Sequence, residues 1–202
     1  MSETETPEPE SQTPKPKRKP LPKSVTTAVL VVVVAVAGYL IYGELQRQKV
    51  TEIVRDRFRG AELNLSKLEI SDGDLSTFAD VLESEKRTAL RVLRVNDTKI
   101  GDAGVRIIVA RFPQLDRLAL NETQVSNDGL KLLGQLKALR YLELDGVPLD
   151  ESAATSLVEI TSLKTLSYSP DKLSAEGMTV LQSKDIVLVP DGRTESRIPS
   201  KP

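Results

Sequence analysis

The apolar positions of this 202-residue chain recur at a fixed distance. Each copy reads apolar-x-x-apolar-x-apolar-x-x-turn residue, and the alternation of apolar and polar positions predicts a short strand. Copies that begin 24 or 25 residues apart indicate stacked units that bury a shared apolar column. The five predicted copies are Leu65, Leu68, Ile70, Gly73; Leu90, Leu93, Val95, Thr98; Leu115, Leu118, Leu120, Thr123; Leu139, Leu142, Leu144, Val147; and Leu163, Leu166, Tyr168, Asp171.

A helix is predicted to follow each strand. Small polar residues such as Ser126 precede it and can accept hydrogen bonds from the free amides at a helix start. Apolar residues then recur at three-residue spacing, as at Leu130, Leu133 and Leu136. Thr123 is expected to hydrogen-bond the turning backbone from inside. Each copy is therefore predicted to form a strand, a turn, a helix and a connection to the next strand.

The unit resembles a leucine-rich repeat of the Thr-containing class found in many bacterial proteins. The strand pattern and the helix start at Asn127–Leu133 carry the resemblance, which covers about residues 61–189. It implies an α/β solenoid with parallel strands on a concave face and short helices on a convex face. It also implies that the concave face binds protein. The chain departs from the family pattern at Gly73, Val147, Tyr168 and Asp171.

A second pattern precedes the repeats. Val25–Tyr42 contains 18 residues without a charge, and as a helix it would span roughly 27 Å, close to the thickness of a bilayer core. We therefore predict a transmembrane helix over residues 24–43. Five Lys/Arg residues lie within ten positions before it and two lie within ten positions after it. The positive-inside rule then places the C-terminal repeats on the non-cytosolic side of a single-pass protein, in a bacterial cytoplasmic membrane.

A cleaved signal peptide is the alternative for this segment. Ala35, Val36 and Ala37 before Gly38 resemble a signal-peptidase site. An uncleaved anchor is favoured because the apolar run continues to Tyr42 and a long proline-rich tail precedes it.

The flanking segments complete the predicted organisation. Residues 1–23 hold six of the 12 prolines and are predicted to be a disordered Pro/Lys/Glu-rich tail, with an SH3-type ligand as a lesser alternative. Residues 44–60 are predicted to form a helical stalk, whose stripe of Val50, Val54 and Phe58 would cap the open end of the repeats. A last edge strand is expected at 186–189, and residues 190–202 are predicted to be a disordered tail.

Candidate binding residues are the polar members of the predicted strands. Arg94, Arg117 and Tyr141 are favoured because Arg and Tyr dominate interface hot spots. Five such strands would form a face only about 20 Å across, which is small for a standard interface. The full candidate set is Lys67, Glu69, Arg94, Asn96, Arg117, Asn121, Tyr141, Glu143 and Asp145.

The residue types present also restrict the chemistry. The chain has no Cys and no His, which removes disulfides, thiolate metal sites, the commonest general base and the commonest zinc ligand. Glu143 and Asp145 could act as paired carboxylates, and Asp145 with Asp171 could bridge calcium, but no inserted segment would build a pocket around them. No cofactor, metal ion, nucleic acid or small-molecule substrate is therefore expected.

These patterns lead to two functional hypotheses. The first is a membrane-anchored, non-catalytic leucine-rich repeat protein that mediates protein–protein interaction. The alternative is a structural or assembly subunit of a membrane complex, in which the transmembrane helix and stalk carry the specificity.

Overall fold

The computed structural model describes the backbone of residues 23–82 and 84–190, and the side chains of 35–82 and 86–190. The predicted tails lie outside the described residues, except for Lys23 and Pro190. The chain divides into two units, Met1–Glu44 and Leu45–Pro202. The first unit contains the beginning of helix α1 (Lys23–Arg57).

Among the described residues, no helix combines the length and the apolar character that crossing a membrane requires. The side chains of 24–34, which make up the first half of the predicted span, lie outside the description.

The second unit is an α/β structure built on one seven-stranded sheet. Its strands follow one another in chain order, β2 to β7 are parallel, and only β1 is antiparallel to its neighbour. The strands are β1 (Phe58–Arg59), β2 (Glu62–Asn64), β3 (Val92–Arg94), β4 (Arg117–Ala119), β5 (Tyr141–Leu144), β6 (Thr165–Tyr168) and β7 (Val187–Pro190).

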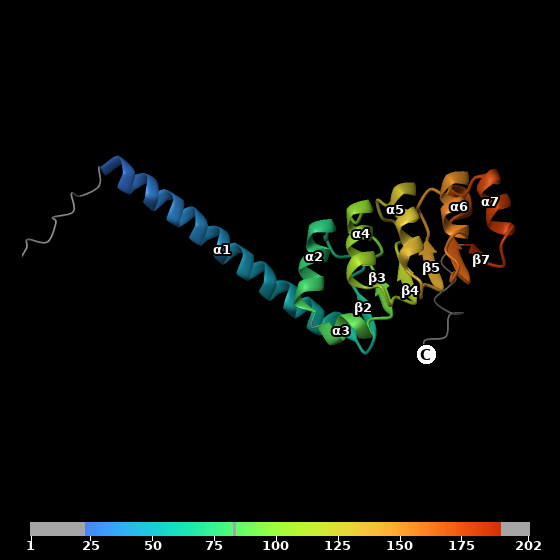
Figure 1. Cartoon of the computed structure of the whole chain (residues 1–202), viewed down its shortest axis with the longest axis horizontal. Coiled ribbons are helices and arrows are strands. Elements are labelled where there is room, and N and C mark those ends of the chain that lie inside the picture. The colour runs from blue at the N-terminus through green and yellow to red at the C-terminus, as the bar shows by residue number, and fades with distance from the viewer. Residues whose placement is uncertain (1–22, 83, 191–202) are drawn as a thin grey trace, which may run out of the picture. The chain divides into compact units, whose positions relative to one another are not determined.

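Helices connect the parallel strands, and all of them except the short α3 (Ser84–Ala89) lie side by side along one face of the sheet (Figure 1). A mainly apolar core fills the space between the helices and the strands. The described helices after α1 are α2 (Asp72–Val81), α3 (Ser84–Ala89), α4 (Asp102–Arg111), α5 (Asn127–Leu132), α6 (Glu151–Val158) and α7 (Ala175–Gln182), with 3-10 turns η1 (Leu133–Gln135) and η2 (Pro170–Lys172).

The predicted apolar column is confirmed. Leu93 pairs in register with Leu118, Leu118 with Leu142, and Leu142 with Leu166, and each of them is at most 1% exposed. Burying one such side chain contributes roughly 1.5–3 kcal/mol.

The predicted frame of the first copy, starting at Leu65, is wrong. Leu63 is the residue paired with Leu93, so 30 residues rather than 25 separate the first two strands. The extra length accommodates α3, which has no counterpart between the later pairs of strands. Leu65 is also buried, but it corresponds to Val95, the next inward-facing residue after Leu93. In the same alignment, Leu68 corresponds to Thr98. The departure at Gly73 therefore came from the misplaced frame.

The turns after the strands also follow the prediction. The Thr98 and Thr123 hydroxyls each donate to a strand carbonyl three residues earlier, over 2.6 Å. Ser126 and Ser174 cap helices α5 and α7 by accepting from backbone amides. The helical stalk was predicted to reach residue 60, but α1 ends at Arg57, and Gly60 turns the chain between β1 and β2 with a φ of +60°.

The apolar stripe of residues 44–60 packs as predicted. Val50 and Val54 are 7% and 8% exposed and belong to the core of the second unit, and Phe58 packs against that core. Phe58 also pairs with Leu63, so β1 covers the first edge of the parallel strands.

Candidate functional site

The face of the sheet turned away from the helices carries the polar residues. Register alignment places them in two columns along the strands and a third just beyond them. The first column is Glu62, Val92, Arg117, Tyr141 and Thr165; the second is Asn64, Arg94, Ala119, Glu143 and Ser167; the third is Ser66, Asn96, Asn121, Asp145 and Ser169.

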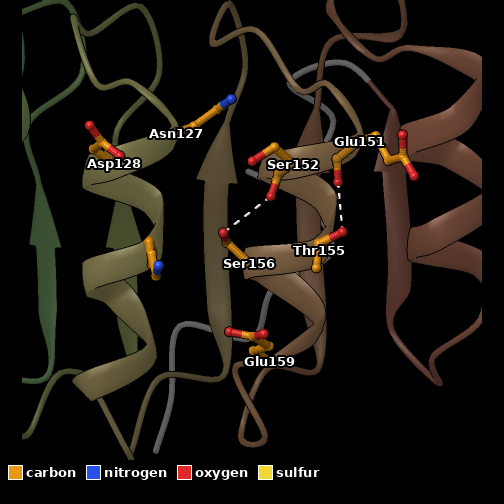
Figure 2. A pocket seen from close by; sticks show the side chains of 8 residues that line it. Asn127, Asp128, Glu151, Ser152, Thr155, Ser156 and Glu159 are labelled. Carbon is orange, nitrogen blue, oxygen red and sulfur yellow. Dashed lines mark hydrogen bonds between the residues drawn. The ribbon is translucent and has the colours of Figure 1, made fainter.

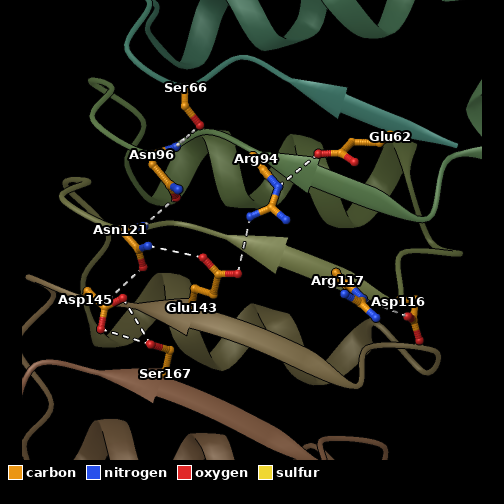
Figure 3. A network of polar contacts seen from close by, with 10 residues as sticks. All are labelled: Glu62, Ser66, Arg94, Asn96, Asp116, Arg117, Asn121, Glu143, Asp145 and Ser167. Carbon is orange, nitrogen blue, oxygen red and sulfur yellow. Dashed lines mark hydrogen bonds and ion pairs between the residues drawn. The ribbon is translucent and has the colours of Figure 1, made fainter. Parts of the chain in front are cut away.

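Arg94 connects three strands across the centre of this face (Figure 3). Its Nε donates to Glu62 on β2 over 3.0 Å, and its Nη1 approaches Glu143 on β5 at 3.5 Å. Ala119 on β4 lies between Arg94 and Glu143 and is only 2% exposed. The small alanine lets the guanidinium reach across β4. Ala119 therefore lies on the polar face and is nevertheless covered.

A second set of contacts follows the exit ends of the strands. Asn96 accepts from the Asn121 amide over 3.0 Å, and Asn121 accepts from the Asp145 amide over 2.8 Å. Ser167 then donates to the Asp145 carboxylate over 3.1 Å (Figure 3). These side chains replace the backbone hydrogen bonds that the ending strands no longer supply. Asn96, Asn121 and Asp145 therefore have a clear structural role.

A cationic and aromatic cluster occupies the entry ends of the strands. The Arg117 guanidinium lies 4.4 Å from the centre of the Tyr141 ring, and Asp116 pairs with both Arg117 and Arg140. The carboxylate of Asp116 raises the pKa of Arg140 by accepting its hydrogen bond and through its charge. The cluster therefore holds two guanidinium groups beside the Tyr141 ring, with Asp116 balancing part of their charge.

Seven of the nine predicted residues share this surface, but two do not. Lys67 and Glu69 follow β2 rather than forming part of it, because the first copy was placed in the wrong frame. Glu69 pairs with Lys99 over 2.6 Å, and the pair lowers the pKa of Glu69 and raises that of Lys99.

The described residues also form a shallow polar hollow of about 420 Å³ on the helical side. It lies between α5 and α6, away from the predicted site (Figure 2). Thr155 and Ser156 donate to carbonyls four residues earlier in their own helix, so neither hydroxyl proton is directed at a ligand. Within the described part of the chain, no group of three or more acidic residues could hold a metal ion.

The chain matches no known protein-family model, and no curated protein matches it significantly.

Two features of the surface escaped the sequence analysis. The residues Lys67, Asp97 and Glu122 all take positive φ angles, of 62°, 58° and 52°, at the same place after a strand. Asp72 and Asp102, each at the start of a helix, accept hydrogen bonds from the N-cap residue of the neighbouring helix. Asp72 accepts from the Gly101 amide, and Asp102 accepts from the Ser126 hydroxyl over 2.6 Å. Gly146 has a positive φ at the same position after β5, and this glycine is the sequence signal from which the left-handed turns could have been predicted.

Proposed function

We propose that this chain is a leucine-rich repeat protein that binds a protein partner through the polar face of its sheet. One observation carries the proposal: Leu93, Leu118 and Leu142 form one buried column, while the alternate strand positions present charged and aromatic side chains on the opposite face. A stack of this kind turns one face into a continuous, rigid display surface.

We further propose that residues 24–43 anchor the protein in a membrane. The support is the uncharged stretch Val25–Tyr42 together with a continuous helix from Lys23 to Arg57. Tyr39 and Tyr42 are 77% and 62% exposed, and aromatic side chains favour the interface at the end of a span. The distribution of Lys and Arg puts the repeats on the non-cytosolic side.

The role proposed for the sheet face is recognition rather than catalysis. Glu143 accepts hydrogen bonds from Arg94 and Asn121, and Asp145 accepts from Ser167. Carboxylates held in this way have a structural function and are poorly placed to exchange protons with a substrate. The open hollow between α5 and α6 gives no shelter from water.

The test uses a photo-crosslinking residue placed on either side of the molecule in the intact membrane. Position Arg117 probes the sheet face, and position Lys131 on α5 serves as the matched control. We expect a defined crosslinked partner from Arg117 only, identified by mass spectrometry and abolished by Tyr141→Ala. Equal crosslinking from both positions, or from Lys131 alone, would contradict the proposal.

An assembly subunit remains the second candidate, because exposed apolar side chains concentrate on α1. Val36, Leu40, Ile41 and Leu45 are all more than half exposed. Replacing residues 24–43 with an unrelated anchor separates the candidates, since Val50 and Val54 stay in the core. Loss of the crosslinked partner after the exchange would favour the assembly role.

A further inference from the structure

In the part of the chain that the structure describes, β7 is the last strand of the sheet and has a neighbour on one side only (Figure 1). Among the described large apolar side chains after Leu45, only that of Val187 on β7 is exposed, at 62%. The Val187 amide donates to the Lys164 carbonyl, so ladder alternation directs the amide and carbonyl of Leu188 away from β6. The open edge therefore offers both an apolar side chain and backbone hydrogen-bonding groups.

Three apolar side chains beside this edge are less covered than their equivalents in the preceding layers. Leu188 is only partly buried, although Leu166, which pairs with it, is 0% exposed. Leu173 is partly buried, although Leu149, which bridges to it, is 0% exposed. Met178, the fourth residue of α7, is also partly buried, whereas the fourth residues of α4, α5 and α6 are 0% exposed. The last layer thus has an apolar outer side, whereas a terminal repeat that faces water requires a polar one.

The first edge of the sheet differs from this last edge. β1 runs antiparallel to β2 there and consists of two residues, and Val50 and Val54 of the adjoining helix are buried in the core. A head-to-tail contact between copies would place the four residues of β7 against this two-residue strand. The first edge is therefore a poor match for the last one, which disfavours an open filament of copies.

We propose that β7 pairs antiparallel with β7 of a second copy, about a two-fold axis that passes beside Leu188 perpendicular to the sheet. The amide and carbonyl of each Leu188 then bond to the carbonyl and amide of the other. Val187 of each copy lies beside Val189 of the other on the polar face. The sheet continues from one copy into the next.

This register also accommodates the proline at the end of β7. Pro190 has no amide hydrogen, and the axis places it opposite Ile186 of the second copy. The Ile186 amide already donates to the Lys184 carbonyl over 2.8 Å. No backbone donor is therefore left facing the proline, and the pairing loses no hydrogen bond there.

A second copy fits this edge better than a foreign extended strand. A single added strand would cover Leu188 and Val187, but Leu173 and Met178 belong to the connection and helix that pack behind the sheet. The occupant must therefore bring an apolar helix at the same spacing from its strand edge. The two-fold axis supplies it, because it places α7 beside α7 of the second copy. Such isologous contacts are the commonest form of oligomer.

The dimer changes the surface that is available for binding. An axis perpendicular to the sheet keeps both polar faces on the same side, so that two faces of about 20 Å lie next to each other. A single face is small for a standard interface, and two in one plane reach the size that such an interface requires. The paired edge is separate from the polar face, so the dimer and the proposed binding of a protein partner can be tested independently.

The contact itself is small. Each copy contributes one four-residue strand and one eight-residue helix, which are about 13 Å and 12 Å long. This area is below the roughly 800 Å² that each partner buries in a standard interface. The dimer is therefore expected to be weak in dilute solution and to benefit from confinement in a membrane. A covalent capture in the membrane is the appropriate measurement.

The test uses single-cysteine forms of the full chain, which has no cysteine of its own. Val187→Cys and Val189→Cys are made separately, carry different tags and are coexpressed. In the proposed register these positions form a non-hydrogen-bonded pair with α carbons about 4.5 Å apart, a distance that a disulfide spans. Neither position lies opposite itself.

Crosslinking is started with a mild oxidant and followed by gel electrophoresis under non-reducing conditions. We expect the coexpressed pair to crosslink at least about tenfold faster than either variant alone, because only the pair brings two thiols together. Arg106→Cys with Lys131→Cys is the control for random collision, since both positions are exposed on the helical side. Thermal melts equal to that of the parent confirm that the variants fold.

Two crosslinking results would overturn the dimer. They are a pair that crosslinks no faster than the control, and either variant alone crosslinking as fast as the pair. Labelling of the thiols with a maleimide then identifies the reason. Fast labelling shows that the edge is open, and slow labelling without crosslinking shows that another segment or protein covers it. If the dimer fails while position Arg117 still crosslinks to a foreign protein, the proposed function stands.

Discussion

Two kinds of position in this fold restrict which residue the backbone can accept. The turns after β2, β3, β4 and β5 use a left-handed backbone, which Lys67, Asp97 and Glu122 adopt at a cost and Gly146 adopts freely. Gly104 is restricted for a different reason, because a side chain there would meet the Asp72 carboxylate at the start of α2.

Substitution of Gly104 tests this close approach. A Cβ at Gly104 would lie 2.4 Å from Asp72 Oδ1 and 2.6 Å from Ile100 Cγ2. We expect Gly104→Ala to destabilise the fold by about 1–3 kcal/mol through overpacking. Gly73→Ala is the control, since that helical position has nothing within 4 Å and should gain about 0.5–1 kcal/mol. Denaturant unfolding measures the change in the free energy of unfolding for both variants. Equal changes would contradict the close approach of Asp72 and Ile100 to position 104.

The cap of α6 predicts a pH dependence. The backbone amide of Ala153, and then the side chain of Asn127, lower the pKa of Asp150. A carboxyl with a lowered folded pKa stabilises the fold above its ordinary value of about 3.9, and the contribution is lost as the pH falls through the folded pKa. The midpoint of thermal unfolding should therefore be higher for the parent than for Asp150→Asn at pH 7, and the difference should shrink as the pH falls below the ordinary value of about 3.9. A difference that is constant across this range would refute the prediction.

At the scale of elements, the last turns of α1 belong to the core. Val50 and Val54 pack there, and β1 pairs with β2 through Phe58 and Leu63. The sequence predicted this cap from a four-residue spacing, because an apolar stripe on an otherwise polar helix requires a partner.

Introducing a charge into the stripe tests its role. We expect Val54→Asp in the full chain to lower the midpoint of thermal unfolding by several degrees, since a carboxylate must then be buried or the cap must detach. Gln48→Asp, at an exposed position of the same helix, should leave the midpoint nearly unchanged. Similar shifts for the two variants would show that the stripe does not cap the sheet.

At the scale of the whole molecule, stability depends on the leucine column that runs through successive strands. Leu142 lies in the middle of this column, paired with Leu118 and Leu166. A defect there breaks the packing between β4 and β6 on either side of β5 and opens the apolar core that all the strands share.

We expect Leu142→Asp to be unfolded at room temperature and to show no cooperative thermal transition. The side chain at this site is 1% exposed, and burying a charge there would cost several kcal/mol. Thr165→Asp on the polar face is the control and should melt within a few degrees of the parent. Circular dichroism against temperature distinguishes the two. A parental melt for Leu142→Asp would refute the burial assignment.

The polar face shows where sequence reasoning stopped. Arg94, Glu143 and Asn121 were placed on the same face from the two-residue alternation, which depends only on local geometry. Their mutual hydrogen bonds were not foreseen, because contact across β4 depends on the size of Ala119 and on strand register. Lys67 and Glu69 were misplaced because a fixed period cannot detect the inserted helix α3.

The sequence alone determined the alternation of strands and helices from β3 onward, the buried column from Leu93 to Leu166 and helix caps such as Ser126, since these depend on local spacing and short-range hydrogen bonds. Only the tertiary structure decided the 30-residue spacing between β2 and β3 and the bridge from Glu62 through Arg94 to Glu143. Those features arise where residues from different strands meet. How close two such residues lie is set by how the strands pair rather than by the number of residues between them in the chain.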